Sequence, residues 1–152
     1  MKEKERILSL FQKLYEGEPW IDINTKSTLS KISAARASAR VLEKCNTIWE
    51  IVNHIINWRM VVLQRIKEIH VVTPDNNFFE PVIDTSESAW KNTLERLKDS
   101  QQQWITFLKT FKESDFEKLY QNKYMSYYEH IQGIIQHDAY HLGQITLLSK
   151  II

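Results

Sequence analysis

Apolar side chains recur with the period of an α-helix in four separate segments of this chain. They form a stripe in residues 2–15, and stronger stripes follow in residues 47–69, 84–108 and 127–150. Apolar positions three and four residues apart face one side of a helix, so each segment predicts an amphipathic helix. No segment shows the strict alternation of a half-buried strand. The pattern predicts an all-α protein with four long helices.

Short signals mark the ends of these helices. Gly17 stops the first helix, because glycine commonly follows the last helical residue. Thr47 and Glu50 have the spacing of a capping box, in which the hydroxyl accepts from one backbone amide and the carboxylate reaches back to another. Asp84 and Glu87 repeat this spacing and predict the start of the third helix.

The connections between the predicted helices are long. Residues 20–45 have a weak apolar pattern and predict an irregular connection with one short helix. Residues 70–85 contain two prolines and two adjacent asparagines, and a loop of this length often shapes a site. We expect one four-helix-bundle domain over residues 1–152, with a long crossover connection between the first two long helices.

Charge and composition narrow the class of protein. The 152 residues carry 20 basic and 19 acidic side chains, a balance that predicts no nucleic-acid partner and no attraction to a membrane surface. No apolar run approaches the about 18 residues that a membrane span requires. Cys45 is the single cysteine and cannot form an internal disulfide, and the N-terminus does not resemble a secretory signal. We therefore expect a cytoplasmic protein.

His137 and His141 lie four residues apart in the last predicted helix. Residues at this spacing are offset by about 40° around the axis, so both imidazoles project from one side and can share an ion. A catalytic divalent centre usually has three protein ligands, and His54 lies within the apolar stripe of the second helix. His70 and His130 lie near helix ends, where a solvated or hydrogen-bonded imidazole is expected.

Two interpretations of His54, His137 and His141 are possible on this pattern. A single histidine on an apolar face is more often a hydrogen-bonded core residue than a metal ligand. Three buried imidazoles would each need a separate partner and would lose their charge by desolvation, whereas one divalent cation satisfies all three. The pattern therefore favours a metal site.

Other residues near these histidines are weaker candidates for the site. Metal-bound imidazoles usually donate their second N–H to a carboxylate or carbonyl, and Glu50 and Asp138 are within reach in sequence. Glu50 already has a capping role, and Asp138 has the features of a solvated surface charge. Gly143 suggests close helix packing, whereas Gln144 either lines the site or links helices. Possible pocket walls, which are also ordinary core or dimer residues, are Trp58, Phe78, Phe79 and Tyr140.

Two segments resemble the sequence hallmarks of a known family. NTIWEIVNHIINWR at residues 46–59 and YYEHIQGIIQHDAYHLGQITLL at residues 127–148 are similar to the two motifs of the DinB/YfiT-like superfamily. The resemblance implies a four-helix bundle in which three histidines hold a divalent ion, commonly nickel or zinc. By motif position these histidines are His54, His137 and His141, and relatives that dimerise imply a homodimer.

The resemblance also implies a range of reactions, because relatives include thiol S-transferases, thiol-dependent isomerases and metal-dependent hydrolases. We expect an enzyme that transfers a low-molecular-weight thiol, similar to bacillithiol, to a small electrophilic substrate. Arg59 and Arg65 are candidates to bind the carboxylates of such a thiol. Metal-dependent hydrolysis is the close variant. The alternative is a non-catalytic metal-binding protein with a role in stress or in interaction, since the fold alone cannot choose.

Overall fold

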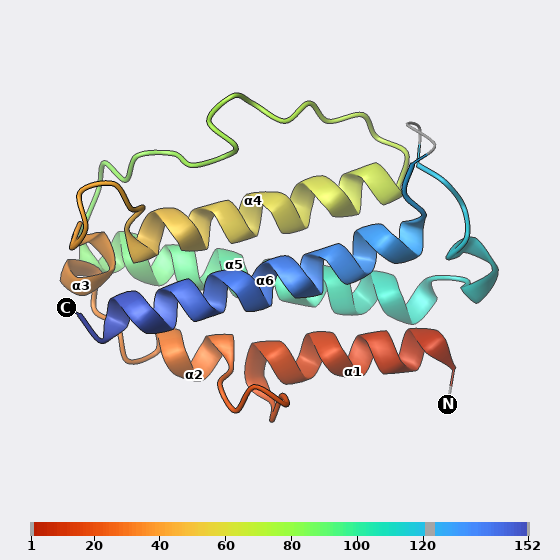
Figure 1. The fold of residues 1–152 in the computed structure, drawn as a ribbon, viewed down its shortest axis with the longest axis horizontal. Coiled ribbons are helices and arrows are strands. Elements are labelled where there is room, and N and C mark those ends of the chain that lie inside the picture. Colours follow the sequence, from red (N-terminus) through yellow and green to blue (C-terminus); the bar gives the residue numbers. More distant parts are fainter. Residues whose placement is uncertain (1, 121–123, 152) are drawn as a thin grey trace.

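The computed structural model describes residues 2–120 and 124–151. Within these ranges the regular structure is helical, apart from an isolated bridge between Leu119 and Ser126. The long helices are α1 (Glu3–Glu16), α4 (Ile48–Ile66), α5 (Glu87–Thr110) and α6 (Tyr127–Ser149) (Figure 1). The connections contain α2 (Thr25–Leu29), α3 (Ala34–Ser38) and the 3-10 turn η1 (Glu113–Asp115). The predicted all-α four-helix bundle is confirmed.

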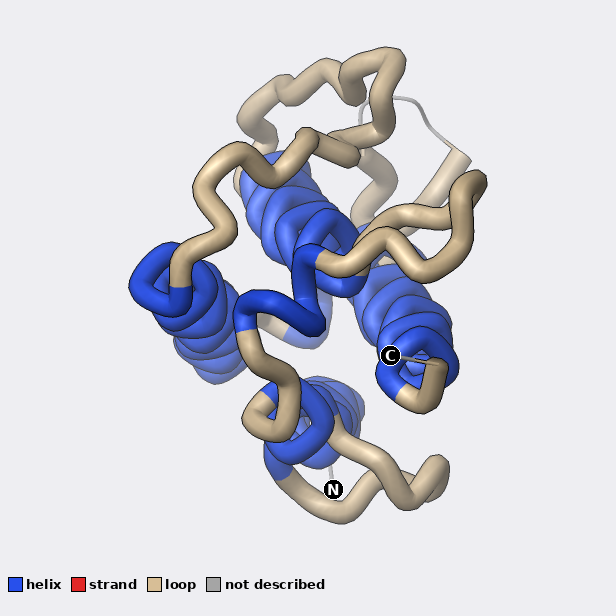
Figure 2. Tube along the Cα trace, turned by 90° about the vertical axis from the view of Figure 1, so that its left-hand side faces the viewer, coloured by secondary structure: helices blue, strands red, loops and turns tan. Residues whose placement is uncertain are grey.

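The long helices occupy the four corners of the bundle. Both α4 and α1 pack against α5 and α6, so α4 and α1 lie on opposite corners (Figure 2). The helices α4 and α5 run in the same direction, and α1 and α6 run in the other (Figure 1). None of the helices in the described residues is long and apolar enough to cross a membrane.

The long crossover lies at a different place from the predicted one. Because α4 and α5 are parallel, the chain must return along the whole bundle between them, and residues 67–86 do so as an extended loop (Figure 1). Residues 17–47 instead continue from α1 to the bundle end where α4 begins. Two five-residue helices, α2 and α3, shorten this connection and pack against the long helices. The crossover was misplaced because an apolar period locates a helix but does not tell in which direction it runs along the bundle.

The start of α5 also differs from the prediction. Ser86 is the N-cap, and its hydroxyl accepts from the amide of Ala89 at 3.2 Å. Asp84 lies before the helix, where its carboxylate accepts from the Ser86 amide at 2.9 Å. Glu87 bonds the amide of Ala34 at 3.0 Å and so joins α5 to α3. The predicted pairing of Asp84 with Glu87 is therefore wrong, because each carboxylate has another backbone partner.

Two clusters of buried apolar side chains fill the bundle. One is centred on Trp49 and Trp90, whose ring centroids are 4.9 Å apart. The other is centred on Phe11 and Trp104, which stack at 5.1 Å. On α4, α5 and α6 the residues between these two clusters are polar and buried, namely Arg59, Ser100, Gln101 and Asp138. The core is thus apolar toward each end and polar in its middle layer.

Hydrogen bonds in this polar layer connect all four long helices. The guanidinium of Arg59 on α4 binds the carboxylate of Asp138 on α6 at 2.8 Å. Its Nη1 also donates to the amide oxygen of Gln101 on α5 at 3.0 Å. The amide nitrogen of Gln101 donates in turn to the carbonyl of Phe11 on α1 at 3.1 Å. One network therefore fixes the helices relative to one another beside the predicted site.

Candidate metal centre

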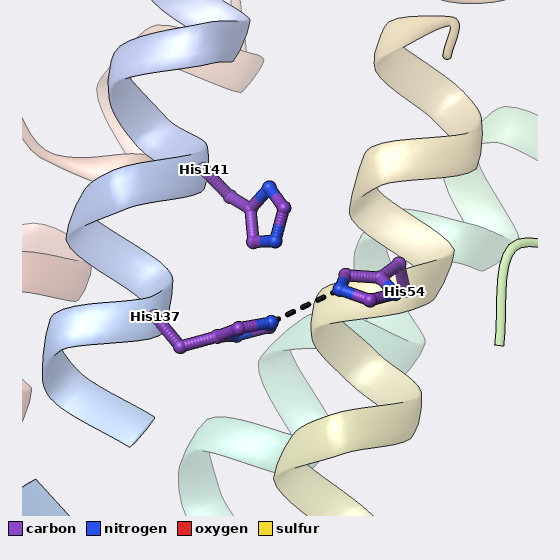
Figure 3. A group of neighbouring side chains, drawn as sticks. All are labelled: His54, His137 and His141. Atoms are coloured by element: carbon purple, nitrogen blue, oxygen red, sulfur yellow. Dashed lines mark hydrogen bonds between the residues drawn. The ribbon is translucent and has the colours of Figure 1, made fainter. Parts of the chain in front are cut away.

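The helices α4 and α6 bring the three predicted ligands together (Figure 3). One ring nitrogen from each of His54, His137 and His141 lies within 4.8 Å of the other two, and Nε2 of His54 is hydrogen-bonded to Nε2 of His137 at 3.0 Å. Two nitrogens on one tetrahedral zinc ion at about 2.0–2.1 Å are about 3.3–3.4 Å apart. The spacing of the imidazoles therefore fits one divalent ion.

A capping box fixes the start of the helix that carries His54. The Thr47 hydroxyl accepts from the Glu50 amide at 3.1 Å, and the Glu50 carboxylate accepts from the Thr47 amide at 2.7 Å. This carboxylate also pairs with Arg40 at 2.7 Å. The predicted box is confirmed, and Glu50 has no oxygen directed at the histidines because both are bonded to Arg40 and Thr47.

Backbone and amide oxygens orient two of the three imidazoles. The Nδ1 of His54 lies 2.7 Å from the carbonyl of Asn77, which can only accept, so Nδ1 carries the proton and Nε2 presents a lone pair. The Nδ1 of His141 lies 2.6 Å from the amide oxygen of Gln144, whose nitrogen donates to Tyr140 at 2.9 Å. Both histidines thus present Nε2 in the form that binds a metal.

Asn77 contacts the histidine cluster, and the sequence did not indicate this contact. It lies in the crossover loop, far in sequence from its contacts, and its side chain also accepts from the indole of Trp58 at 3.2 Å. Its backbone has a φ of 52°, a left-handed conformation that asparagine tolerates better than most residues. The adjacent asparagines were a signal for a turn, and no local pattern indicated the contact with His54.

Asp138 is buried, which excludes one of its two interpretations, a solvated surface charge. Its side chain is 3% exposed and pairs with Arg59. One of its oxygens, Oδ1, lies 3.7 Å from Nδ1 of His137. Among the described residues neither of these two atoms has a hydrogen-bond partner. His137 is therefore the one histidine of the cluster whose second nitrogen is not held by a hydrogen bond.

Burial favours the neutral form of two of the imidazoles, those of His54 and His141. Desolvation lowers the pKa of His54 to about 4, the nearby His137 and His141 lower it further, and the Asn77 carbonyl opposes the shift. Desolvation is also the main cause that lowers the pKa of His141. Neutral imidazole is the form that coordinates metal ions, so the electrostatics and the geometry agree.

The histidines lie at the wall of a cavity of about 660 Å³. Phe79 stacks on His54 with ring centroids 3.9 Å apart, and Trp58 and Tyr140 also line the cavity. Three of the four aromatic candidates thus line the cavity, whereas Phe78 does not and packs edge-on against Trp58 at 5.5 Å. Lys44 is the basic side chain among the lining residues, and none of the described lining residues is acidic.

The two predicted carboxylate-binding arginines are engaged elsewhere. Arg59 is 1% exposed and belongs to the buried polar layer, so it cannot reach a ligand in the cavity. Arg65 donates to the carbonyl of Val71 and the hydroxyl of Thr73, each at 2.9 Å. Its guanidinium also lies 5.5 Å from the ring centroid of Trp58. The prediction for Arg59 is wrong because burial against Asp138 was not visible in the sequence.

Three further residues take no part in the cluster. His70 is exposed, and His130 is half-buried with its ring 5.5 Å from that of Tyr120. A side chain added at Gly143 would meet nothing within 4 Å, so the prediction of close helix packing at this glycine is wrong. The expectation that His70 and His130 lie outside the metal cluster agrees with the geometry.

Fold and site together define a helical-bundle protein with a three-histidine cluster on two antiparallel helices. The sequence model of the DinB superfamily matches residues 24–145, and the chain belongs to this family. The resemblance carried by the two motifs is therefore confirmed. A comparison with curated proteins finds no match.

Two solved structures share the fold. A conserved protein from Enterococcus faecalis superposes with a TM-score of 0.78 at 12% identity, over 100% of this chain and 98% of that one. The colibactin self-resistance protein ClbS, crystallised with a dsDNA, superposes with a TM-score of 0.73 at 19% identity, over 97% and 95% of the two chains. At these identities the comparison shows a common fold and no more.

The exclusion of nucleic-acid partners is wrong. ClbS has this fold and is crystallised with dsDNA, so the fold is compatible with a nucleic-acid partner. The error lies in the use of net charge, which averages over the whole surface, whereas phosphate contacts depend on local basic groups. Residues 24–46 contain one acidic side chain, Glu43, and five basic ones, which are Lys26, Lys31, Arg36, Arg40 and Lys44.

The metal-free protein should lose stability as the pH falls from 6.5 toward 4. In this window the unfolded chain protonates His54, whose ordinary pKa is 6.5, but the folded protein does not until the pH reaches about 4. Above 6.5 the imidazole is neutral in both states and its titration contributes nothing. We expect the free energy of unfolding, measured with urea in the presence of a chelator, to fall less steeply in His54→Gln than in the wild type.

His70→Gln is the matched control, because the His70 side chain is exposed and lies outside the cluster. This variant should retain the wild-type slope. An identical slope in His54→Gln and the wild type would show that His54 is not buried in its neutral form.

Proposed function

We propose that this protein is a divalent-metal-dependent enzyme in which His54, His137 and His141 hold the ion. The observation that supports this most is the convergence of three imidazole nitrogens within 4.8 Å at a cavity wall. Nickel and zinc are the metals that the family resemblance implies, and imidazole ligands suit both. A bound ion of this kind supplies Lewis acidity toward a thiol or water in the cavity.

We further propose that the reaction transfers a low-molecular-weight thiol, similar to bacillithiol, to an electrophilic small molecule. A thiol on a divalent ion would release its proton to solvent and react as the thiolate, so it needs no carboxylate base. No carboxylate is found among the described residues that line the cavity. This makes thiol transfer a better fit than hydrolysis, which stays the close variant. A metal-binding protein without turnover, active in stress or interaction, is the alternative.

The cavity residues have distinct parts in this reaction. Phe79 and Trp58 form apolar walls on the metal side of the cavity. Asn77 and Gln144 hold the Nε2 atoms of His54 and His141 toward the ion position. Lys44 is exposed at the cavity and, among the described residues, forms no ion pair that would neutralise it. We assign Lys44 the carboxylate-binding role that Arg59 cannot fill.

We also propose that this protein acts as a homodimer in the cytoplasm. The crossover loop presents large apolar side chains to solvent, with Ile69, Val72 and Ile83 exposed by 52%, 72% and 89%. Contact with a second copy would cover such side chains. Cys45 is exposed and free, as is usual for a thiol in a reducing compartment.

Duplex DNA is a second candidate ligand. It is favoured by the basic segment at residues 24–46 and by the structure of ClbS, which has the same fold and is crystallised with dsDNA. Of the basic side chains in this segment, Lys26 pairs with Glu16 and Arg40 with Glu50. These ion pairs reduce the charge that is free to contact phosphate, so we rank DNA below a small-molecule ligand.

The proposed enzyme should consume a thiol only when metal is bound. Chelator-stripped protein is loaded with zinc, nickel or manganese, and loss of bacillithiol, cysteine or glutathione is followed with a reactive electrophile such as monobromobimane. We expect turnover with at least one metal. His141→Ala removes a proposed ligand and should reduce turnover more than about 100-fold. Loss of a residue that only hydrogen-bonds to a ligand has at most about this effect.

Lys44→Gln tests the recognition of the thiol. It should raise KM about two- to fivefold for a carboxylate-bearing thiol, as expected for an exposed ion pair, and leave KM for the neutral 2-mercaptoethanol unchanged. Lys91→Gln, an exposed substitution on α5, serves as the control. Absence of turnover with every metal and thiol would refute the transferase and leave the non-catalytic alternative.

If duplex DNA is a ligand, the affinity for a fluorescent 20-base-pair duplex should fall steeply with salt, because phosphate contacts release counterions. Lys31→Gln combined with Lys44→Gln should lower the slope of log K against log salt by about two, since each phosphate contact contributes about 0.9. Lys91→Gln combined with Lys98→Gln on α5 is the matched control. An unchanged slope in the first pair would remove residues 24–46 as the contact surface.

A further inference from the structure

Two buried polar atoms face each other at the edge of the metal cluster without forming a hydrogen bond. They are Nδ1 of His137 and Oδ1 of Asp138, which lie 3.7 Å apart. Neither has a hydrogen-bond partner among the described residues. Buried donors and acceptors are rarely left unpaired, because the loss of solvation is then not offset. Nδ1 of His137 and Oδ1 of Asp138 are therefore exceptions, since both are buried and neither is hydrogen-bonded although they lie 3.7 Å apart.

The ion pair with Arg59 leaves this one carboxylate oxygen free. Nε and Nη2 of Arg59 both bind Oδ2 of Asp138, each at 2.8 Å. A guanidinium commonly binds a carboxylate through both oxygens, with one N–H on each. Here both contacts fall on Oδ2, so Oδ1 retains its capacity to accept a hydrogen bond. It is directed toward the imidazole of the preceding residue.

The guanidinium is itself fixed from other helices. Its Nη1 donates to Gln101 at 3.0 Å and to the hydroxyl of Ser100 at 3.4 Å. The indole of Trp104 donates to the Arg59 carbonyl at 3.0 Å and secures the backbone at the same residue. With side chains only 1% and 3% exposed, Arg59 and Asp138 are inaccessible to bulk water. The free oxygen of Asp138 is therefore held in one position.

The other two imidazoles show what is missing at His137. His54 and His141 each have an acceptor on Nδ1, the Asn77 carbonyl at 2.7 Å and the Gln144 amide oxygen at 2.6 Å. Such acceptors fix the tautomer and ring orientation of a metal-bound histidine and increase its basicity. His137 lacks this bond, and the free oxygen of Asp138 lies beside it.

We propose that Asp138 is the positioning residue for His137, and that Arg59 holds Asp138 in place for this purpose. In the metal-free structure the proton of neutral His137 is on Nε2, which donates to Nε2 of His54. An ion at this position would require that proton on Nδ1 instead, from which it would be donated to Oδ1 of Asp138. The Nε2 lone pair then faces the ion together with those of His54 and His141. The inference rests on the proposed metal site. It adds a hydrogen-bonded path from the ion through His137, Asp138 and Arg59 to α5.

A double substitution tests the proposal without leaving a buried charge unpaired. Removal of Asp138 alone would strand the Arg59 guanidinium and destabilise the fold, whereas replacement of both partners by apolar residues is often tolerated. We expect Arg59→Met with Asp138→Leu to raise the Kd for zinc about 10- to 100-fold, the usual effect of losing such a partner. Affinity is measured by competition with a chromophoric chelator at pH 7.

Arg59→Met with Asp138→Asn is the matched control. It removes the same ion pair but retains an amide oxygen that can accept from Nδ1 of His137. This variant should bind zinc more tightly than the leucine variant and close to the wild type. Equal zinc affinity in the wild type and a folded leucine variant would overturn the role of Asp138.

A direct readout comes from the Nδ1 protons of zinc-loaded wild-type protein with 15N-labelled histidine. We expect slowly exchanging Nδ1–H signals from His54, His137 and His141, and loss of the His137 signal in the leucine variant. A zinc-loaded wild type without a protected His137 signal would overturn the inference even if no variant folds. If the wild type binds no zinc at all, the proposed function fails, which is a different result from metal binding that ignores Asp138.

Discussion

The buried ion pair between Arg59 and Asp138 is the interaction on which the rest of the structure depends. It lies between two apolar clusters and, through Gln101, links α4, α6, α5 and α1. Two charges taken out of water lower stability unless their remaining hydrogen-bonding groups are satisfied, so the pair requires this arrangement of neighbours. It also fixes the rotation of α6. With Asp138 directed into the core, His137 and His141 face α4 and the cavity.

The helices and the crossover loop contribute different groups to the site, because the ion pair of Arg59 with Asp138 fixes the helices. Rigid helices supply the three imidazoles, and the crossover loop supplies the carbonyl of Asn77 and the ring of Phe79 that orient and cover His54. Loops on a fixed scaffold commonly carry binding groups, since they can change without disturbing the core. The loop between the parallel helices α4 and α5 is thus both a connection and a wall of the site.

Much of the fold, and the residues of the cluster, were predictable from local patterns. The apolar period located the long helices, and the spacing of Thr47 and Glu50 located the start of α4, because both signals act within a few residues. His54, His137 and His141 shared apolar faces and could be grouped before any contact was known.

The place of the crossover was not predictable, since an apolar period locates a helix but does not tell in which direction it runs along the bundle. The burial of Arg59 and Asp138, and the contact of Asn77 with His54, join distant segments and leave no local signal. Net charge failed as a guide to nucleic acid because it contains no spatial information.

A crystal of metal-loaded protein tests most directly whether His54, His137 and His141 hold one divalent ion. Elemental analysis should give one ion per chain, and the anomalous-scattering map should place it between the imidazoles of His54, His137 and His141. For zinc, three nitrogens at about 2.0–2.1 Å are expected. A metal-loaded crystal with no anomalous peak between these rings, or with the ion bound by other side chains, would contradict the account.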